Sequence, residues 1–260
     1  MKPIAPLLSL FFIPVAFVAL CAAEPETASI QPFAGTPLEP GYKLTWSDEF
    51  SGSSLDVTKW VYRTDHKMES SQLPANVTVA NGILTLHLKK EAVGGKQYTG
   101  GGVISKNTFK YGYYEAKLKT PPGSGWHTAF WTQKHDGSGG TDPKDTVMAF
   151  DVIFNDSFDP GSYVLNTHQW KPNYRAHGTH TVKSPNLSAD FHVFGCEFTP
   201  DTVKYFFDGA LVQTVNAKEF EHGDMNIWLT SIARLSKKAP IDDSKLPATA
   251  QFDYVRFFSK

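Results

Sequence analysis

The sequence predicts an all-β protein built as a two-sheet β-sandwich. Short runs of alternating, β-branched and aromatic residues are separated by turn residues, and Asn81-Gly82 and Asp208-Gly209 lie between such runs as hairpin turns do. No apolar segment of helical period extends beyond about ten residues, which disfavours an alternating α/β chain. A sandwich of this length is commonly a single unit, so we expect one folded domain.

The first 23 residues have the order of a secretory signal peptide. Lys2 precedes an apolar stretch at residues 4–20, and small residues follow it. We expect cleavage after Ala23 and a secreted protein, extracellular or periplasmic, with no membrane segment after cleavage. The alternatives are a membrane anchor, which Pro3, Pro6 and Pro14 disfavour, and lipid attachment at Cys21.

Residues 24–41 contain four prolines and no hydrophobic period, so we interpret them as a linker or an extended N-terminal segment. The folded domain is expected at residues 42–260. Cys196 is the one cysteine left after leader removal, and its alternating surroundings predict a buried, inert thiol. Alternation and composition predict strands at residues 77–80, 83–88, 191–198, 203–207 and 210–212.

The charge of the chain is balanced. It has 25 basic and 26 acidic residues and a net charge of -1, without a dense basic run. A nucleic-acid partner is therefore excluded on charge, since such proteins carry a basic footprint. We expect a monomer that binds a neutral ligand.

Six segments in matching order resemble glycoside hydrolase family 16. The resemblance extends over residues 42–260. It implies a concanavalin-A-like jelly roll with a glycan cleft on its concave face, a β-linked polysaccharide or oligosaccharide as partner, and no required cofactor. The segments are residues 44–52, 73–84, 109–117, 125–131, 191–209 and 252–258.

The catalytic strand of that family reads Glu-x-Asp-x-x-Glu. Alternation and a bulge place both glutamates in the cleft, where retaining hydrolysis needs carboxyls about 5 to 5.5 Å apart. The matching stretch here has Ala149 at the nucleophile position, Phe154 at the acid/base position and Asp151 as the one retained carboxylate. Alanine and phenylalanine supply neither nucleophile nor proton, so the resemblance implies that retaining hydrolysis is lost.

Three functions follow from this strand. The first is glycan binding without cleavage. The second is an active endo-β-glycosidase that hydrolyses O-glycosyl bonds with displaced residues, for which Asp151 and Asp156 would need the inverting separation of about 6.5 to 9.5 Å. The third is an extracellular structural or interaction protein without a sugar ligand. For Asp151 itself, a leftover hydrogen-bonded carboxylate is the alternative to a catalytic role.

The resemblance also implies cleft residues that contact sugar. Aromatic side chains stack on the apolar faces of sugar rings, and polar groups fix the hydroxyls. For Trp131, core packing is an equal alternative, and His127 departs from the family, which often has proline at that position. The implied contacts are Asn76, Trp126, Trp131, His168 and Trp170.

A structural calcium ion on the convex face is a further implication of the resemblance. Calcium binds oxygen ligands, both carboxylates and backbone carbonyls. Asp253 would supply one ligand, together with Glu49 or the carbonyl of Gly82. A catalytic metal is not expected, because the chain has no His-Glu-x-x-His motif.

Overall fold

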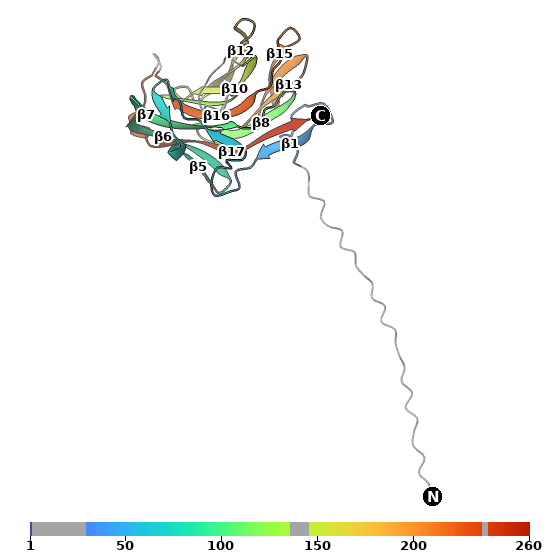
Figure 1. The fold of residues 1–260 in the computed structure, drawn as a ribbon, viewed down its shortest axis with the longest axis horizontal. Helices are drawn as coiled ribbons and strands as arrows, with labels where there is room; N and C mark the ends of the chain where they lie inside the picture. The colour runs from blue at the N-terminus through green and yellow to red at the C-terminus, as the bar shows by residue number, and fades with distance from the viewer. Residues whose placement is uncertain (2–29, 136–145, 236–238) are drawn as a thin grey trace.

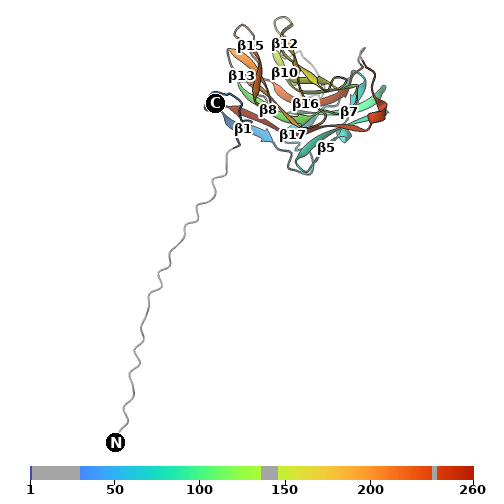
Figure 2. The ribbon, with the colours of Figure 1, turned by 180° about the vertical axis from the view of Figure 1, so that it is seen from behind.

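The computed structural model describes residue 1 and residues 30–135, 146–235 and 239–260. These residues form two packed layers of largely antiparallel strands, with β1 and β17 in one layer and β10 and β12 in the other (Figures 1 and 2). The predicted all-β sandwich of jelly-roll type is confirmed. The expected signal peptide, including Cys21, lies outside the described residues.

The layer that we call the β17 sheet has β17 near its centre. The order of pairing is β5, β6, β17, β8, β13, β14 and β15, with β1 beside the C-terminal half of β17. The strands are β1 (Lys43–Asp48), β5 (Val77–Ala80), β6 (Ile83–Val93), β8 (Gly112–Lys119), β13 (His192–Phe198), β14 (Thr202–Phe207), β15 (Ala210–Asn216) and β17 (Ala248–Ser259).

The other layer, the β10 sheet, has the order β2, β7, β16, β9, β10, β11 and β12. The short strands β3 and β4 join β7 at one edge. The strands are β2 (Trp60–Tyr62), β3 (His66–Lys67), β4 (Ser70–Gln72), β7 (Lys96–Ser105), β9 (Trp126–Gln133), β10 (Met148–Asp156), β11 (Ser162–Gln169), β12 (Arg175–Lys183) and β16 (Asn226–Ala233).

Hairpin turns fix the register where the sequence predicts them. Asn81 and Gly82 join β5 to β6 with φ values of 53° and 76°, and Asp208 and Gly209 join β14 to β15 with 46° and 80°. Two successive positive φ angles match the twist of the paired strands, and Asn-Gly and Asp-Gly tolerate them best. The predicted strand positions in these two hairpins are confirmed.

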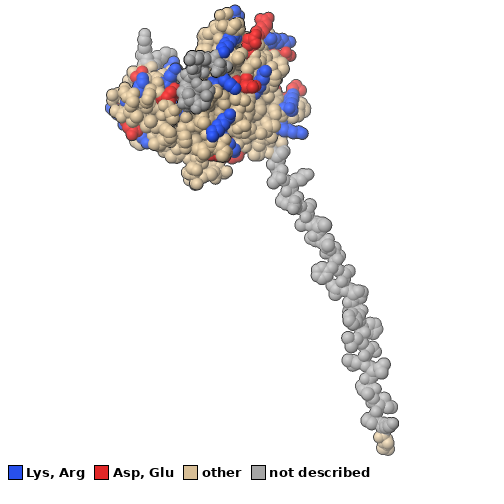
Figure 3. Space-filling view, viewed as in Figure 1, with Lys and Arg blue, Asp and Glu red and all other residues tan. Residues whose placement is uncertain are grey.

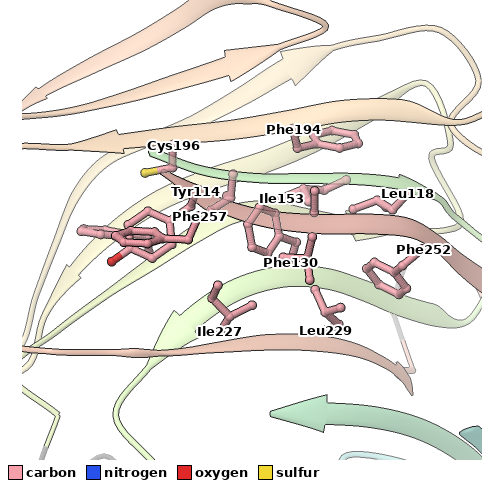
Figure 4. Close-up of a cluster of buried hydrophobic side chains, with 14 of the residues drawn as sticks. Tyr114, Leu118, Phe130, Ile153, Phe194, Cys196, Ile227, Leu229, Phe252 and Phe257 are labelled. Carbon is pink, nitrogen blue, oxygen red and sulfur yellow. The ribbon is translucent and has the colours of Figure 1, made fainter. Parts of the chain in front are cut away.

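The core lies between the two sheets (Figure 4). Each fully buried large apolar side chain stabilises the fold by about 1.5 to 3 kcal/mol. Burial raises the pKa of the Cys196 thiol well above its usual range, as expected for an inert cysteine. The labelled side chains come from both layers: Tyr114, Leu118, Phe194, Cys196, Phe252 and Phe257 from the β17 sheet, and Phe130, Ile153, Ile227 and Leu229 from the β10 sheet.

Residues 30–42 run along the face of the β17 sheet that points away from the core. The backbone N–H of Phe33 donates to Glu115 Oε2 at 2.8 Å, and the Tyr42 hydroxyl donates to Glu197 Oε1 at 2.9 Å. Leu38 packs against an aromatic cluster on the same face. These contacts favour an extended N-terminal segment over a free linker.

The structure has two 3-10 turns, η1 (Pro74–Asn76) and η2 (Asp243–Lys245), within the described ranges. None of the described helices has the length and apolar character required to cross a membrane. Basic and acidic side chains are interspersed on the face seen in Figure 3.

Candidate glycan-binding cleft

Strand β10 carries the bulge that the catalytic strand of family 16 requires. Against β9, Asp151 pairs with Trp131 and Ile153 pairs with Phe130, so Val152 is the extra residue. Val152 and Ile153 both lie in the core, which returns the next residue of β10 to the side of Asp151. Asp151 and Phe154 therefore share the outer face of the β10 sheet.

Strand β9 alternates between the core and a hollow on this outer face. Phe130 points into the core, whereas Trp131 and Gln133 face the hollow. The hollow has a volume of about 330 Å³. We call it the first hollow; its lining includes His127, Ala129, Trp131, Gln133, Phe154, Trp170, Thr230, Ile232 and Arg234.

The first hollow offers hydrogen-bond donors and cations. Gln133 Nε2 and Trp170 Nε1 are buried and have no partner among the described residues. Lys67 adds positive charge, and no described Asp or Glu lines this hollow. Arg63 and Arg234 also line it, but Asp65 engages Arg63 at 2.7 Å and Asp156 engages Arg234 at 3.2 Å. This lining can bind a ligand rich in acceptor oxygens.

The aromatic rings of the cleft are arranged for stacking. Trp131 lies 4.7 Å from Trp228, and its indole N–H donates to Thr230 Oγ1 at 3.2 Å. Trp170 lies 5.9 Å from His168 and 5.0 Å from Tyr174, centroid to centroid. A row of rings at a cleft rim can stack on sugar faces.

Asp151 is tied into a hydrogen-bonded chain. Its Oδ2 lies 2.5 Å from His168 Nε2, and His168 Nδ1 lies 3.1 Å from the Tyr174 hydroxyl. Asp151 is 3% exposed, whereas Tyr174 is exposed. Sequence reasoning missed Tyr174, because it lies in a polar loop without a periodic pattern.

A second ionic cluster lies further along β10. Asp156 Oδ1 is 2.6 Å from His127 Nδ1 and 3.2 Å from Arg234 Nη1. Burial raises the pKa of Asp156, but the hydrogen bond and charge of His127 and the charge of Arg234 outweigh burial and hold this pKa below its usual value. Asp156 is therefore ionised at neutral pH.

Two of the expected sugar contacts are wrong. Trp126 is 1% exposed and packs against Leu88 and Ala248. It lies an even number of residues from Phe130 on β9, so it faces the same side of the strand as that core residue. Asn76 is completely buried, and its Nδ2 donates to the carbonyl of Gly100 at 3.1 Å. The alternation of β9 was available in the sequence and would have identified Trp126 as a core residue.

The residues expected to hold calcium are engaged by cations. Both carboxylate oxygens of Glu49 accept hydrogen bonds from Arg256, at 2.9 and 2.8 Å, and Asp253 pairs with Lys117 at 2.7 Å. Across the described ranges no group of three or more His, Cys, Asp or Glu side chains could hold a metal. The calcium site at Asp253 with Glu49 or the Gly82 carbonyl therefore stays a prediction.

Comparisons with known proteins agree with this architecture. A family model described as Beta-porphyranase A-D, GH16 domain, matches residues 43–259. Glucan endo-1,3-beta-glucosidase A1 of Niallia circulans is 25% identical over 87% of the chain and 39% of that protein. Kappa-carrageenase of Pseudoalteromonas carrageenovora is 28% identical over 100% of the chain and 75% of that protein.

Solved structures share the fold. The endo-beta-1,3-glucanase of Pyrococcus furiosus aligns with a TM-score of 0.72 and 22% identity, over 84% of the chain and 94% of that structure. LamAcat of Zobellia galactanivorans aligns with a TM-score of 0.74 and 23% identity, over 83% and 98%. Since the family model spans most of the sequence, the chain belongs to glycoside hydrolase family 16.

Proposed function

We propose that this protein is a secreted glycan-binding member of family 16 that binds a β-linked polysaccharide or oligosaccharide and has lost retaining hydrolysis. One observation carries the proposal: the strand lacks a carboxylate at both catalytic positions, and an open hollow lined by hydrogen-bond donors lies beside it. By the resemblance, Ala149 and Phe154 stand at the two catalytic positions, while Gln133 and Trp170 of the same hollow have buried donor nitrogens without a partner among the described residues. Binding groups are present, and the carboxyl pair needed for retention is absent.

The pairing of the nearby carboxylates supports loss of cleavage. Asp151 is bonded to His168, and Asp156 is held by His127 and Arg234. A general acid must carry a proton at working pH, and the lowered pKa of Asp156 denies it that role. The alternative of an active endo-β-glycosidase with displaced residues is therefore less well supported.

The chemistry of the first hollow suggests the type of glycan. Trp131 and Trp170 can stack on sugar rings, and the lining donors suit ring and substituent oxygens. Lys67, with no described acid in the lining, favours a β-glycan with an anionic substituent over an unsubstituted one, in contrast to the neutral ligand expected from the balanced charge of the chain. Arg234 contributes less, because Asp156 engages it at 3.2 Å. An open hollow of about 330 Å³ also speaks against a structural protein without a sugar ligand.

Calorimetric titration of the purified protein with laminarin and with sulfated κ-carrageenan tests binding, while a reducing-end assay on the same mixtures tests cleavage. We expect saturable binding, tighter for κ-carrageenan, and a flat reducing-end signal. New reducing ends would overturn the loss of hydrolysis. If both glycans failed to bind, glycan recognition itself would be refuted.

Secretion is tested separately by expressing the full chain in a bacterial host. Intact-mass analysis of protein recovered outside the cytoplasm is expected to show a chain that begins at Glu24. Recovery of the chain only inside the cell with Met1 retained would contradict export.

A further inference from the structure

Phe154 stands between two hollows of the cleft. Beyond its ring lies a second hollow of about 400 Å³, over the ends of β10, β11 and β12. Three residues line both hollows: His127, Phe154 and Arg234. We call these three residues the ridge. The side chains that line the second hollow alone include Asp156, Phe158, Ser162, Val164 and Thr181.

The ridge is braced from two sides. The His127 ring meets the Phe154 ring edge to face, with centroids 4.4 Å apart and planes at 70°. Asp156 holds His127 at 2.6 Å and Arg234 at 3.2 Å, so one ionised carboxylate fixes two members of the ridge. A ridge fixed by packing and charge in this way resists displacement by a ligand.

The two hollows also differ in charge. The first is lined by cations and donors without an acid among its described lining residues, whereas the second contains the carboxylates of Asp156 and Asp159. Each volume is near the lower end of the about 300 to 1,000 Å³ of small-molecule sites, which suits one or two sugar rings. Neither hollow has room for a long glycan segment.

We propose that the ridge has turned a continuous cleft into two separate chambers, so that the protein binds the ends of β-linked glycan chains instead of internal segments. The inference rests on the proposed glycan binding. Two-carboxylate hydrolysis requires an internal bond to lie across the catalytic strand, with carboxyls on either side of it. Phe154 places a rigid apolar ring at that crossing, where it offers no hydrogen bond to a glycosidic oxygen.

Oligosaccharides of increasing length test the partition. The probes are laminaribiose to laminariheptaose and the corresponding κ-carrageenan oligosaccharides, titrated by calorimetry. For the wild-type protein we expect the affinity to change by less than about twofold once one hollow is filled. In Phe154→Ala the two hollows merge, and the longest oligosaccharide should bind about 100-fold more tightly than the shortest, because one chain then occupies both.

Phe158→Ala is the matched control, because Phe158 lines the second hollow without belonging to the ridge. It removes a ring of the same kind, and its affinities should stay independent of length. Equal melting temperatures of the three proteins exclude unfolding as the cause. A wild-type affinity that increases steadily with length would overturn the partition.

Chain ends can also be counted directly. Laminarin and κ-carrageenan that are partly hydrolysed by acid contain more ends than equal masses of the intact polymers. Wild-type protein should bind the fragments in proportion to their ends, and equal binding per mass would overturn recognition of ends. Absence of binding to every probe would refute the proposed function, an outcome distinct from binding without a partition.

Discussion

The outer face of the β17 sheet and the cleft face of the β10 sheet differ in which buried polar atoms lack a partner among the described residues: oxygens of Glu115 and Thr36 on the outer face, and donor nitrogens on the cleft face. On the outer face, Glu197 accepts hydrogen bonds from the Tyr42 hydroxyl and from Lys204, both at 2.9 Å, and Arg256 holds Glu49 with two hydrogen bonds. On the cleft face, Gln133 Nε2 and Trp170 Nε1 are buried without a partner among the described residues.

This difference separates polar groups that stabilise the fold from groups kept for a ligand. A buried donor without a partner costs about 1 to 3 kcal/mol, which a protein bears where a ligand later supplies the acceptor. Polar groups that already have hydrogen-bond partners beneath the segment 30–42 would gain no further hydrogen bond from a ligand. Variants on the two faces should therefore affect different measurements, stability on one face and affinity on the other.

The largest effect is expected from Arg256→Ala on the outer face. This change leaves Glu49 without its partner, and removes the cation 3.9 Å from the fully buried Glu115. Because Glu115 is buried but Glu49 is partly exposed, the loss of Arg256 should reduce the free energy of unfolding by about 1 to 3 kcal/mol, measured by denaturant titration. Lys218→Ala is the control: its pair with Asp201 is exposed, so the loss should stay under about 0.5 kcal/mol. Equal losses would show that burial of the network is unimportant.

A smaller effect is expected from Trp170→Phe in the cleft. It keeps an aromatic ring and removes only the indole N–H, which has no partner among the described residues, so glycan affinity should decrease about tenfold while the melting temperature stays constant or increases. Trp131→Phe is the matched control, because the Trp131 N–H already donates to Thr230 inside the protein. A melting temperature that decreases for Trp170→Phe would assign this N–H to the fold.

The smallest effect concerns pH. Burial raises the pKa of Glu115, against hydrogen bonds from Phe33, Tyr113 and Tyr254 and the charge of Arg256, which lower it. A raised folded-state pKa contributes stability that is full below the unfolded value of about 4.3 and is lost as pH increases through the folded value. The wild-type advantage over Glu115→Gln should therefore shrink from pH 4 upwards, as denaturant titrations across pH would show. An advantage that grows with pH would contradict this sign.

The sequence predicted the parts of the fold that local chemistry decides. Asn81-Gly82 carries its turn geometry within two residues, whereas the bulged strand at Asp151 and Phe154 was implied by the resemblance to family 16. The ridge could not be predicted in this way, because Arg234 and Asp156 are 78 residues apart and meet only through the order of the strands.

The sequence could not predict the buried donors of the cleft either. Gln133 and Trp170 are ordinary residues until strand packing buries their donor nitrogens without an acceptor among the described residues. The wrong prediction for Trp126 had another cause, because the alternation of residues along β9 already indicates which of them face the core.

The bulge at Val152 has a consequence for how this lineage can change. It places Asp151 and Phe154 on the same face of β10 although they are three residues apart. If the same residues paired without the bulge, the faces of the residues after Val152 would be reversed, and Asn155 would point outward in place of Phe154. Substitutions at residues 149 and 154, by contrast, change side chains on an unchanged framework.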